Sequence, residues 1–203
     1  TMAPRLGRLK ARLKARGVRC VYANDNFLDW SADFPALVHR ARQSRGRHVL
    51  APVTPDADDA HILKPRHSAF HQTALACLLE EADVQRVLVT GVSTEACVLT
   101  TALDARIRHF DVAVVADCVA SSSEARRRDT LAVLRHVEIP VPGASRVLAQ
   151  SEVLGGEVEL GVVVTARGDG RDPLDGRRRL GDRRLDADQH PGHGVDDAAL
   201  VGA

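Results

Sequence analysis

The sequence predicts an α/β protein, a three-layer α/β/α sandwich around a mainly parallel sheet. Continuous apolar runs that have the composition of buried strands, such as 85–92 and 111–120, alternate with segments of helical composition. Such alternation is typical of a parallel sheet that is covered by helices on both faces. The length of 203 residues is sufficient for one domain of this kind.

The first half of the chain supplies two of the expected strands. A basic helix is expected over 1–17, because leucines fall on one face and Arg and Lys on the other, and Gly17 ends it. The elements expected next are a strand at 18–23, a loop at 24–34, a short helix at 35–44, a polar loop at 45–60, a strand at 61–64 and a helix at 71–82.

The second half alternates more regularly until residue 137. Strands are expected at 85–92 and 111–120, followed by helices over 94–109 and 124–136, with Ser123 or a neighbouring serine as the cap of the second helix.

The composition of the chain changes after residue 137, where Arg, Gly and Asp dominate. We therefore expect a domain over 1–140 and an irregular tail over 141–203. The tail is either disordered or non-native, as translation in a shifted reading frame would produce. VELGVVVTA (158–166) is an exception with the composition of a strand.

Charge, hydropathy and cysteine content argue against several classes of function. The net charge is +1, with 28 basic and 27 acidic residues, which gives no reason to expect a nucleic-acid partner. No apolar run is long enough for a membrane span, and the basic N-terminus lacks the apolar core of a secretory signal. The four cysteines form no C-x-x-C pair and no close cluster with histidine. We therefore expect no structural zinc and a reducing, cytoplasmic location.

VTGVSTEACVLTTALDA (89–105) places Cys97 in the first turn of a helix, just after a strand. At such a position the helix N–H groups favour a thiolate and can also bind the oxyanion that forms when the thiolate attacks a carbonyl. Open α/β sheets bind ligands at the carboxyl ends of their strands, where this sulfur would lie. The local pattern leaves open the alternative that Cys97 is a small apolar residue that packs against the sheet.

Four segments, in this order, resemble the isochorismatase-like cysteine hydrolases, a superfamily that includes nicotinamidases, isochorismatases and N-carbamoyl amidohydrolases. They are VYANDNFLDWSADF (21–34), ILKPRHSAF (62–70), GVSTEACVLTTALDA (91–105) and DVAVVADCVAS (111–121). The likeness extends over residues 1–136. It implies an isochorismatase-like, Rossmann-like fold and a cysteine hydrolase that acts without a cofactor on a small amide, carbamoyl or related substrate.

The resemblance also implies roles for individual residues. Cys97 would be the nucleophile, and Lys64 would hold its thiolate and help to move protons. A cis peptide bond is implied at Val92–Ser93, with the amides of Ser93 and Cys97 as the oxyanion donors. The predicted substrate pocket consists of Asn24, Asn26, Trp30, His67, Phe70 and Thr94.

Several of these residues have alternative interpretations. Trp30 is equally a candidate subunit contact or core residue, and Thr94 a candidate helix cap. No metal is expected, because the loop after the second strand lacks the histidines with which nicotinamidases bind one. His61, His67 and His71 are spaced as zinc ligands can be, but they span a strand end, a loop and a helix start, which indicates a pocket rim or surface.

The sequence departs from the family pattern in its first strand. In the family that strand precedes the first helix and ends in the catalytic aspartate, whereas here the first helix begins at or near residue 1. We therefore expect the strand and its aspartate to be missing, which would leave the strands at 18–23 and 85–92 with unpaired edges. An alternative is that GVVVTARGD (161–169) fills the position and brings Asp169 near Cys97.

The sequence as a whole predicts a cytoplasmic cysteine hydrolase that forms a covalent intermediate at Cys97. We expect a small-molecule substrate, a homo-oligomer (dimer or tetramer), and neither nucleic acid nor membrane as a partner. Two alternatives remain open. One is a catalytically impaired member of the family that only binds a ligand or partner, and the other is a redox-sensing protein with a low-pKa thiol.

Overall fold

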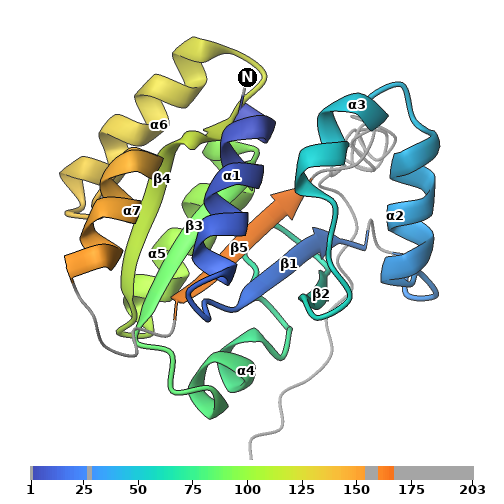
Figure 1. The fold of residues 1–203 in the computed structure, drawn as a ribbon, viewed down its shortest axis with the longest axis horizontal. Helices are drawn as coiled ribbons and strands as arrows, with labels where there is room; N and C mark the ends of the chain where they lie inside the picture. Colours follow the sequence, from blue (N-terminus) through green and yellow to red (C-terminus); the bar gives the residue numbers. More distant parts are fainter. Residues whose placement is uncertain (1, 27–28, 154–159, 167–203) are drawn as a thin grey trace, which may run out of the picture. The chain divides into compact units, whose positions relative to one another are not determined.

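The computed structural model describes residues 2–26, 29–153 and 160–166. Five strands form one parallel sheet in the order β2-β1-β5-β3-β4, which confirms the predicted fold class (Figure 1). The strands are β1 (Cys20–Asp25), β2 (Ala60–Lys64), β3 (Arg86–Val92), β4 (Asp111–Ala120) and β5 (Leu160–Ala166). Because all five strands run in the same direction, their carboxyl ends lie at one edge of the sheet.

Helices cover both faces of the sheet (Figure 1). α1 (Met2–Lys14) and α7 (Ala144–Val153) pack on one face, and α4 (Leu75–Glu81), α5 (Leu99–Ile107) and α6 (Glu124–His136) on the other. The remaining helical segments are α2 (Phe34–Gln43), α3 (Arg47–Leu50) and the short turns η1 (Ala51–Val53) and η2 (Thr94–Val98). No helix in the described ranges combines the length and apolar character that crossing a membrane requires.

The first helix packs through the leucines that its periodicity predicts. Leu6, Leu9 and Leu13 are buried, but Lys10, which was expected on the exposed face, is buried with them. Gly7 lies on the same helix against η1. A Cβ atom at Gly7 would lie 2.3 Å from the carbonyl oxygen of Pro52, so the close approach of α1 and η1 requires a glycine.

β5 corrects the expectation of unpaired strand edges. Its Val163 is in register with Val21 of β1 on one side and with Val89 of β3 on the other. The position between β1 and β3 is therefore occupied, in agreement with the alternative prediction. A run of β-branched apolar residues suits a central strand with both edges paired. Asp169, which was predicted to approach Cys97, lies outside the described residues.

The chain also differs from the expected irregular tail at α7. Ala144 begins this helix, and its N–H donates to Asp117 Oδ1 at 2.8 Å, while Val147 is buried against the sheet. The sequence prediction missed α7 because this helix directly precedes the polar, glycine-rich residues that dominate the composition of the tail. The boundary at residue 140 stays a prediction, and segments 154–159 and 167–203 of the predicted tail lie outside the described residues.

Candidate active site

Cys97 lies in η2, a single turn with π-type hydrogen bonding that joins the end of β3 to α5. The Ser93 carbonyl accepts from the N–H groups of Ala96 and Val98, both at 3.2 Å, and the Val92–Ser93 peptide bond is cis. Turns of the π type occur frequently at functional sites. Because η2 follows β3 and leads into α5, the strand–turn–helix prediction holds. The Cys97 side chain is buried, so the thiol faces inward.

Lys64 is the last residue of β2, and its ammonium group contacts the thiol. Its Nζ lies 3.4 Å from Cys97 Sγ. Lys64 has 0% of its surface exposed and is the largest of the fully buried side chains in the described ranges. A buried ammonium group is tolerated only where it is paired with a charge or with hydrogen-bond acceptors. The predicted proximity of Lys64 and Cys97 is therefore present in the structure.

Asp25 is the third member of this group, and sequence reasoning missed it. It is the last residue of β1 and is in register with Lys64 on the neighbouring strand. Its Oδ1 forms an ion pair with Lys64 Nζ, and its Oδ2 lies 4.0 Å from Cys97 Sγ. The Asp25 side chain is 14% exposed, so the group reaches solvent at this carboxylate.

Hydrogen bonds from the residues that follow β1 and β2 hold these elements together. The Asn26 N–H donates to the Lys64 carbonyl at 2.9 Å, which continues the pairing of β1 and β2 beyond their ends. The Ala69 N–H donates to Thr101 Oγ1 of α5 at 2.9 Å, and Thr101 is fully buried. Because α5 continues directly from η2, these bonds fix Lys64 relative to the turn that carries Cys97.

Four buried side-chain oxygens in the described ranges have no hydrogen-bond partner: Asn24 Oδ1, Thr94 Oγ1, Glu95 Oε2 and Ser121 Oγ. Asn24 and Thr94 are among the predicted pocket residues. All four oxygens lie at the ends of strands or in the turns that come next, on the same edge of the sheet as Cys97. An unsatisfied buried polar atom costs about 1–3 kcal/mol, so such atoms mark places where a ligand can supply the missing partner. Thr94 itself is completely buried.

The other predicted pocket residues are more scattered. Asn26 is buried beside Lys64, whereas His67 is exposed and adopts a φ of 40°. Phe70 is buried in the core and stacks on Phe110, with ring centroids 5.9 Å apart. Trp30 is 74% exposed, so its interpretation as a core residue is wrong. Their contribution to a substrate pocket stays a prediction.

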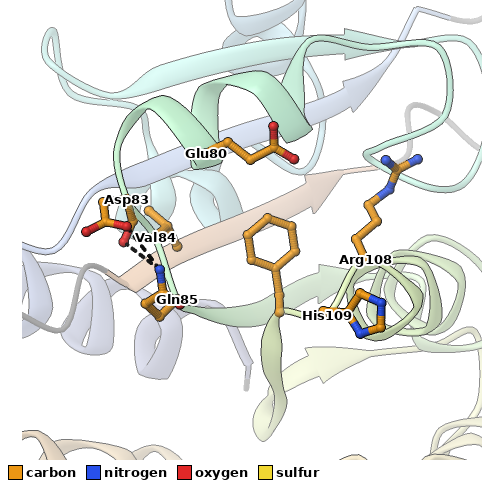
Figure 2. A pocket seen from close by; sticks show the side chains of 7 residues that line it. Glu80, Asp83, Val84, Gln85, Arg108 and His109 are labelled. Atoms are coloured by element: carbon orange, nitrogen blue, oxygen red, sulfur yellow. Dashed lines mark hydrogen bonds between the residues drawn. The ribbon is translucent and has the colours of Figure 1, made fainter.

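A shallow pocket lies elsewhere, at the amino-terminal ends of β3 and β4 (Figure 2). It has a volume of about 250 Å³ and is lined by Glu80, Asp83, Val84, Gln85, Arg108, His109 and Phe110. Gln85 and Phe110 immediately precede β3 and β4, so the pocket lies at the opposite edge of the sheet from Cys97.

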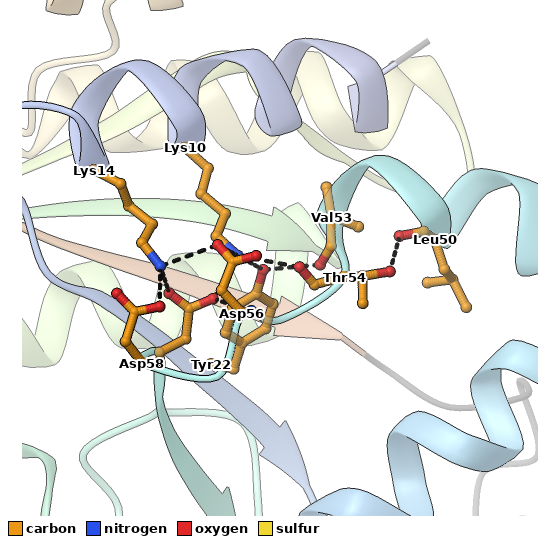
Figure 3. Close-up of polar contacts among 9 residues, drawn as sticks. Lys10, Lys14, Tyr22, Leu50, Val53, Thr54, Asp56 and Asp58 are labelled. Atoms are coloured by element: carbon orange, nitrogen blue, oxygen red, sulfur yellow. Dashed lines mark hydrogen bonds and ion pairs between the residues drawn. The ribbon is translucent and has the colours of Figure 1, made fainter.

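Acidic residues of the loop before β2 gather around two lysines of α1 (Figure 3). Asp56, Asp58 and Asp59 are the group in the described chain whose carboxylates could converge on a metal ion. Lys14 Nζ, however, contacts all three carboxylates at 2.7–3.0 Å, and Lys10 pairs with Asp59. The two lysines already form ion pairs with all three carboxylates, which argues for a structural role.

The three histidines that are spaced as zinc ligands can be do not converge either. His61 is exposed and stacks on Phe34, with ring centroids 4.6 Å apart, and His67 and His71 are exposed on the following loop. No metal-ligand group among the described residues includes them. This arrangement agrees with the interpretation of these histidines as surface or rim residues.

The other three cysteines differ from Cys97 in their surroundings. Burial raises the pKa of Cys20 from its usual 9.0 to about 12, and burial does the same to the pKa of Cys118. Cys77 is exposed, and its hydrogen bond to Glu81 raises its pKa. Cys97 is thus the cysteine in the described chain whose sulfur contacts both an ammonium group and a carboxylate.

The fold and site together define a class: a parallel α/β protein with a thiol, an ammonium group and a carboxylate in contact at the carboxyl edge of its sheet. The chain belongs to the isochorismatase family, since the isochorismatase domain matches residues 1–144. This finding confirms the resemblance on which the sequence analysis relied.

Two relatives illustrate the match. An uncharacterized isochorismatase family protein of Bacillus subtilis, YaaI, is 31% identical over 136 residues, which are 67% of this chain and 75% of that protein. Enterobactin synthase component B of Escherichia coli K12 is 34% identical over 120 residues, but the match covers 59% of this chain and only 39% of that protein.

Solved structures agree on the fold. An isochorismatase-like hydrolase from Alkaliphilus metalliredigens superposes with a TM-score of 0.63 at 24% identity, covering 74% of this chain and 84% of that chain. An isochorismatase family protein from Desulfovibrio vulgaris superposes with a TM-score of 0.61 at 22% identity, and the match covers 76% of this chain and 85% of that chain.

Proposed function

We propose that this protein is a cysteine hydrolase that cleaves a small amide, carbamoyl or related substrate through a covalent intermediate at Cys97. The observation that carries the proposal is the contact between two buried side chains, Lys64 Nζ and Cys97 Sγ, at 3.4 Å. An adjacent cation favours the thiolate, which is the nucleophilic form of cysteine.

The turn that holds Cys97 supports a nucleophilic role. It follows a strand and leads into α5, so its N–H groups lie at the positive end of a helix. Backbone donors at such a place can stabilise the oxyanion of a tetrahedral intermediate, and we assign this role to the amides of Ser93 and Cys97. Removal of one such donor typically lowers the rate about 10²–10³-fold, so these two amides would account for a large share of the catalysis.

The substrate class rests on relatives and on unpaired polar atoms. Ureidoacrylate amidohydrolase of Methylorubrum extorquens is 25% identical over 135 residues, and maleamate amidohydrolase of Pseudomonas putida is 39% identical over 67 residues. Buried oxygens of Asn24 and Thr94 without partners suit a substrate that brings N–H donors, such as a primary amide or a carbamoyl group.

We also propose a cytoplasmic homo-oligomer, a dimer or tetramer, that uses neither nucleic acid nor a membrane as a partner. The exposed side chains of Trp30 and Ile107, at 74% and 75%, are the apolar residues best suited to a subunit contact.

Hydrolysis of maleamate, ureidoacrylate and nicotinamide, measured as ammonia release, tests the function. We expect at least one of them to be hydrolysed by the wild-type protein, and the activity to fall to background in Cys97→Ala. Cys77→Ser, which changes an exposed thiol, is the matched control and should retain the wild-type rate. Mass spectrometry of the reacting enzyme should detect the acyl group on Cys97.

Three outcomes would count against the proposal. Equal rates for wild type and Cys97→Ala would exclude a covalent role for the thiol. Binding of a substrate without turnover, measured by calorimetry, would instead favour a family member that only binds its ligand. Reversible oxidation of Cys97 by peroxide, without hydrolysis, would favour a redox sensor.

A further inference from the structure

We propose that Asp104 is a positioning residue of the site, which acts through Ser68 to hold Lys64 against Cys97. The inference rests on the proposed function and concerns a pair of residues outside the reacting groups. Asp104 lies on α5, and Ser68 lies in the segment that follows β2. Their side chains join α5 to that segment, although they are 36 residues apart in the sequence.

One face of the helix that begins with η2 carries both the thiol and the Asp104 carboxylate. Four residues recur along it at intervals of four, three and four positions: Cys97, Thr101, Asp104 and Arg108. Such intervals place side chains on the same face of a helix, and α5 continues directly from η2. Asp104 lies about 10 Å along the helix from Cys97, at a rise of about 1.5 Å per residue, so it cannot act on the sulfur by contact.

The segment after β2 lies along this face of the helix. It follows Lys64, whose Nζ contacts the thiol at 3.4 Å. The N–H of Ala69 donates to Thr101 Oγ1 at 2.9 Å, one turn further along the helix. The guanidinium carbon of Arg108, at the end of α5, lies 5.2 Å from the centroid of the Phe70 ring. The position of Lys64 at the thiol therefore depends on how the residues that follow it are attached to α5.

Ser68 and Asp104 form a charge-assisted hydrogen bond in the middle of this attachment. Ser68 Oγ donates to Asp104 Oδ2 at 2.7 Å and accepts from the Phe70 N–H at 3.1 Å. Asp104 Oδ1 accepts from Arg108 Nε at 3.0 Å, so both carboxylate oxygens are held. Hydrogen bonds to ionised groups are about twice as strong as neutral ones, and Ser68 is only 8% exposed. Loss of this bond should therefore loosen the segment from α5.

Small movements of the segment matter because the contact at the thiol is close. The attraction between an ammonium group and a thiolate weakens with distance, so a Lys64 that moves away favours the thiolate less. A displacement of about 1 Å at a catalytic group can lower the rate about 10²-fold. Asp104 thus controls the reactivity of Cys97 without touching the thiol.

The test removes each end of the bond in Asp104→Ala, in Ser68→Ala and in the double variant, all on a Cys77→Ser background so that the exposed thiol does not react. The first measurement is hydrolysis of the fastest substrate among maleamate, ureidoacrylate and nicotinamide. We expect kcat to fall by about 10–10²-fold in each single variant, while KM changes little. The double variant should be no slower than the slower single variant, because both changes remove the same interaction.

The second measurement, made without substrate, is the rate of Cys97 alkylation by iodoacetamide as a function of pH. The pH midpoint should move up in Asp104→Ala and Ser68→Ala, because a displaced ammonium group favours the thiolate less. A direct effect of the Asp104 charge on the sulfur would move the midpoint down instead, so the direction separates the two causes. Asp104→Asn keeps an oxygen that can accept from Ser68 and should restore most of the wild-type behaviour.

Arg106→Gln is the matched control, since it removes an exposed ion pair with Glu138 from the same helix and should leave both measurements unchanged. Urea denaturation shows whether each variant is folded, and Ser68→Ala decides alone if Asp104→Ala is not. The inference is overturned by a pH midpoint that stays or falls, by equal losses in Asp104→Asn and Asp104→Ala, or by additive losses in the double variant.

Two results distinguish this inference from the proposed function. Absence of Cys97-dependent hydrolysis in wild type overturns the proposed function, whereas the alkylation profiles, which need no substrate, still decide whether Asp104 positions Lys64. Hydrolysis that depends on Cys97 but is unchanged in Asp104→Ala and Ser68→Ala overturns this inference alone.

Discussion

At the scale of the residue, the candidate site depends on which way three consecutive side chains point. Sequence reasoning selected Asn24 and Asn26, yet it is Asp25, between them, that reaches Lys64 and Cys97. Successive residues of a strand point to opposite faces, and Val21 and Ala23 of β1 lie in the same core cluster as α4 and α5. Asp25 continues that series, which is the signal that could have identified it.

Two lysines of α1 show a second effect at this scale. Burial by itself lowers the pKa of Lys10, but hydrogen bonds to Asp59 and Tyr22 outweigh burial and raise it. The Lys10 side chain is 6% exposed and that of Asp59 is 1% exposed, whereas Lys14 is 20% exposed. The two lysines contact the same carboxylate but differ in how much solvent remains around them.

Lys10→Met should therefore destabilise the fold more than Lys14→Met does. Lys10→Met leaves Asp59 with Lys14 as its partner but removes the buried hydrogen bonds of the Lys10 ammonium group to Asp59 and Tyr22, and we expect a loss of about 3 kcal/mol in the free energy of unfolding. The loss for Lys14→Met should be about 1 kcal/mol or less, as for exposed ion pairs. Urea denaturation of the three proteins measures the difference, and equal losses would contradict a special role for the buried pair.

At the scale of the element, β5 decides whether the sheet is continuous. It pairs with β1 and β3 along most of its length, and both of these strands carry site residues at their ends or in the turn after them. The spacing between Asp25 and Cys97 therefore depends on a strand that comes from the far end of the sequence. Such a pairing is not local, so composition alone left it as an alternative.

Hydrogen exchange can test the position of β5. The amides of Gly161–Thr165 should exchange as slowly as those of β3, because a central strand bonds to both neighbours. Val163→Pro, which removes one N–H from the middle of the strand, should destabilise the protein by about 3 kcal/mol or more. Exchange of 161–165 within seconds, together with an unaffected Val163→Pro variant, would place this segment outside the sheet.

At the scale of the whole molecule, two buried clusters hold the layers together, one on each side of the sheet. The cluster below α1 and α7 includes the thiols of Cys20 and Cys118 and the phenol of Tyr22. Burial raises the pKa of Tyr22 to about 12, as it raises those of the two thiols. These groups therefore stay protonated in the fold at pH values at which they ionise in the unfolded chain.

Stability should consequently fall in alkaline solution. An acid whose folded pKa is raised contributes its full stabilisation below the unfolded value, near 9 for a thiol, and loses it as the pH rises towards about 12. We expect the melting temperature to decrease from pH 9 upwards. The melting temperature of Cys118→Ala, taken relative to its own value at pH 7, should decrease less steeply than that of wild type. An identical slope in both proteins would exclude this thiol as a cause.

The sequence by itself determined the α/β class, most strand and helix positions, and the contact between Lys64 and Cys97 that the family resemblance implies. The class and the element positions depend on apolar periodicity and on local strand–turn–helix order, both of which are properties of neighbouring residues, whereas the Lys64–Cys97 contact was implied by the resemblance alone. Only the tertiary structure decided that Asp25 joins the site and that β5 fills the sheet. Both depend on register between strands that are distant in the sequence, and a shift of one residue reverses which side chains face the site.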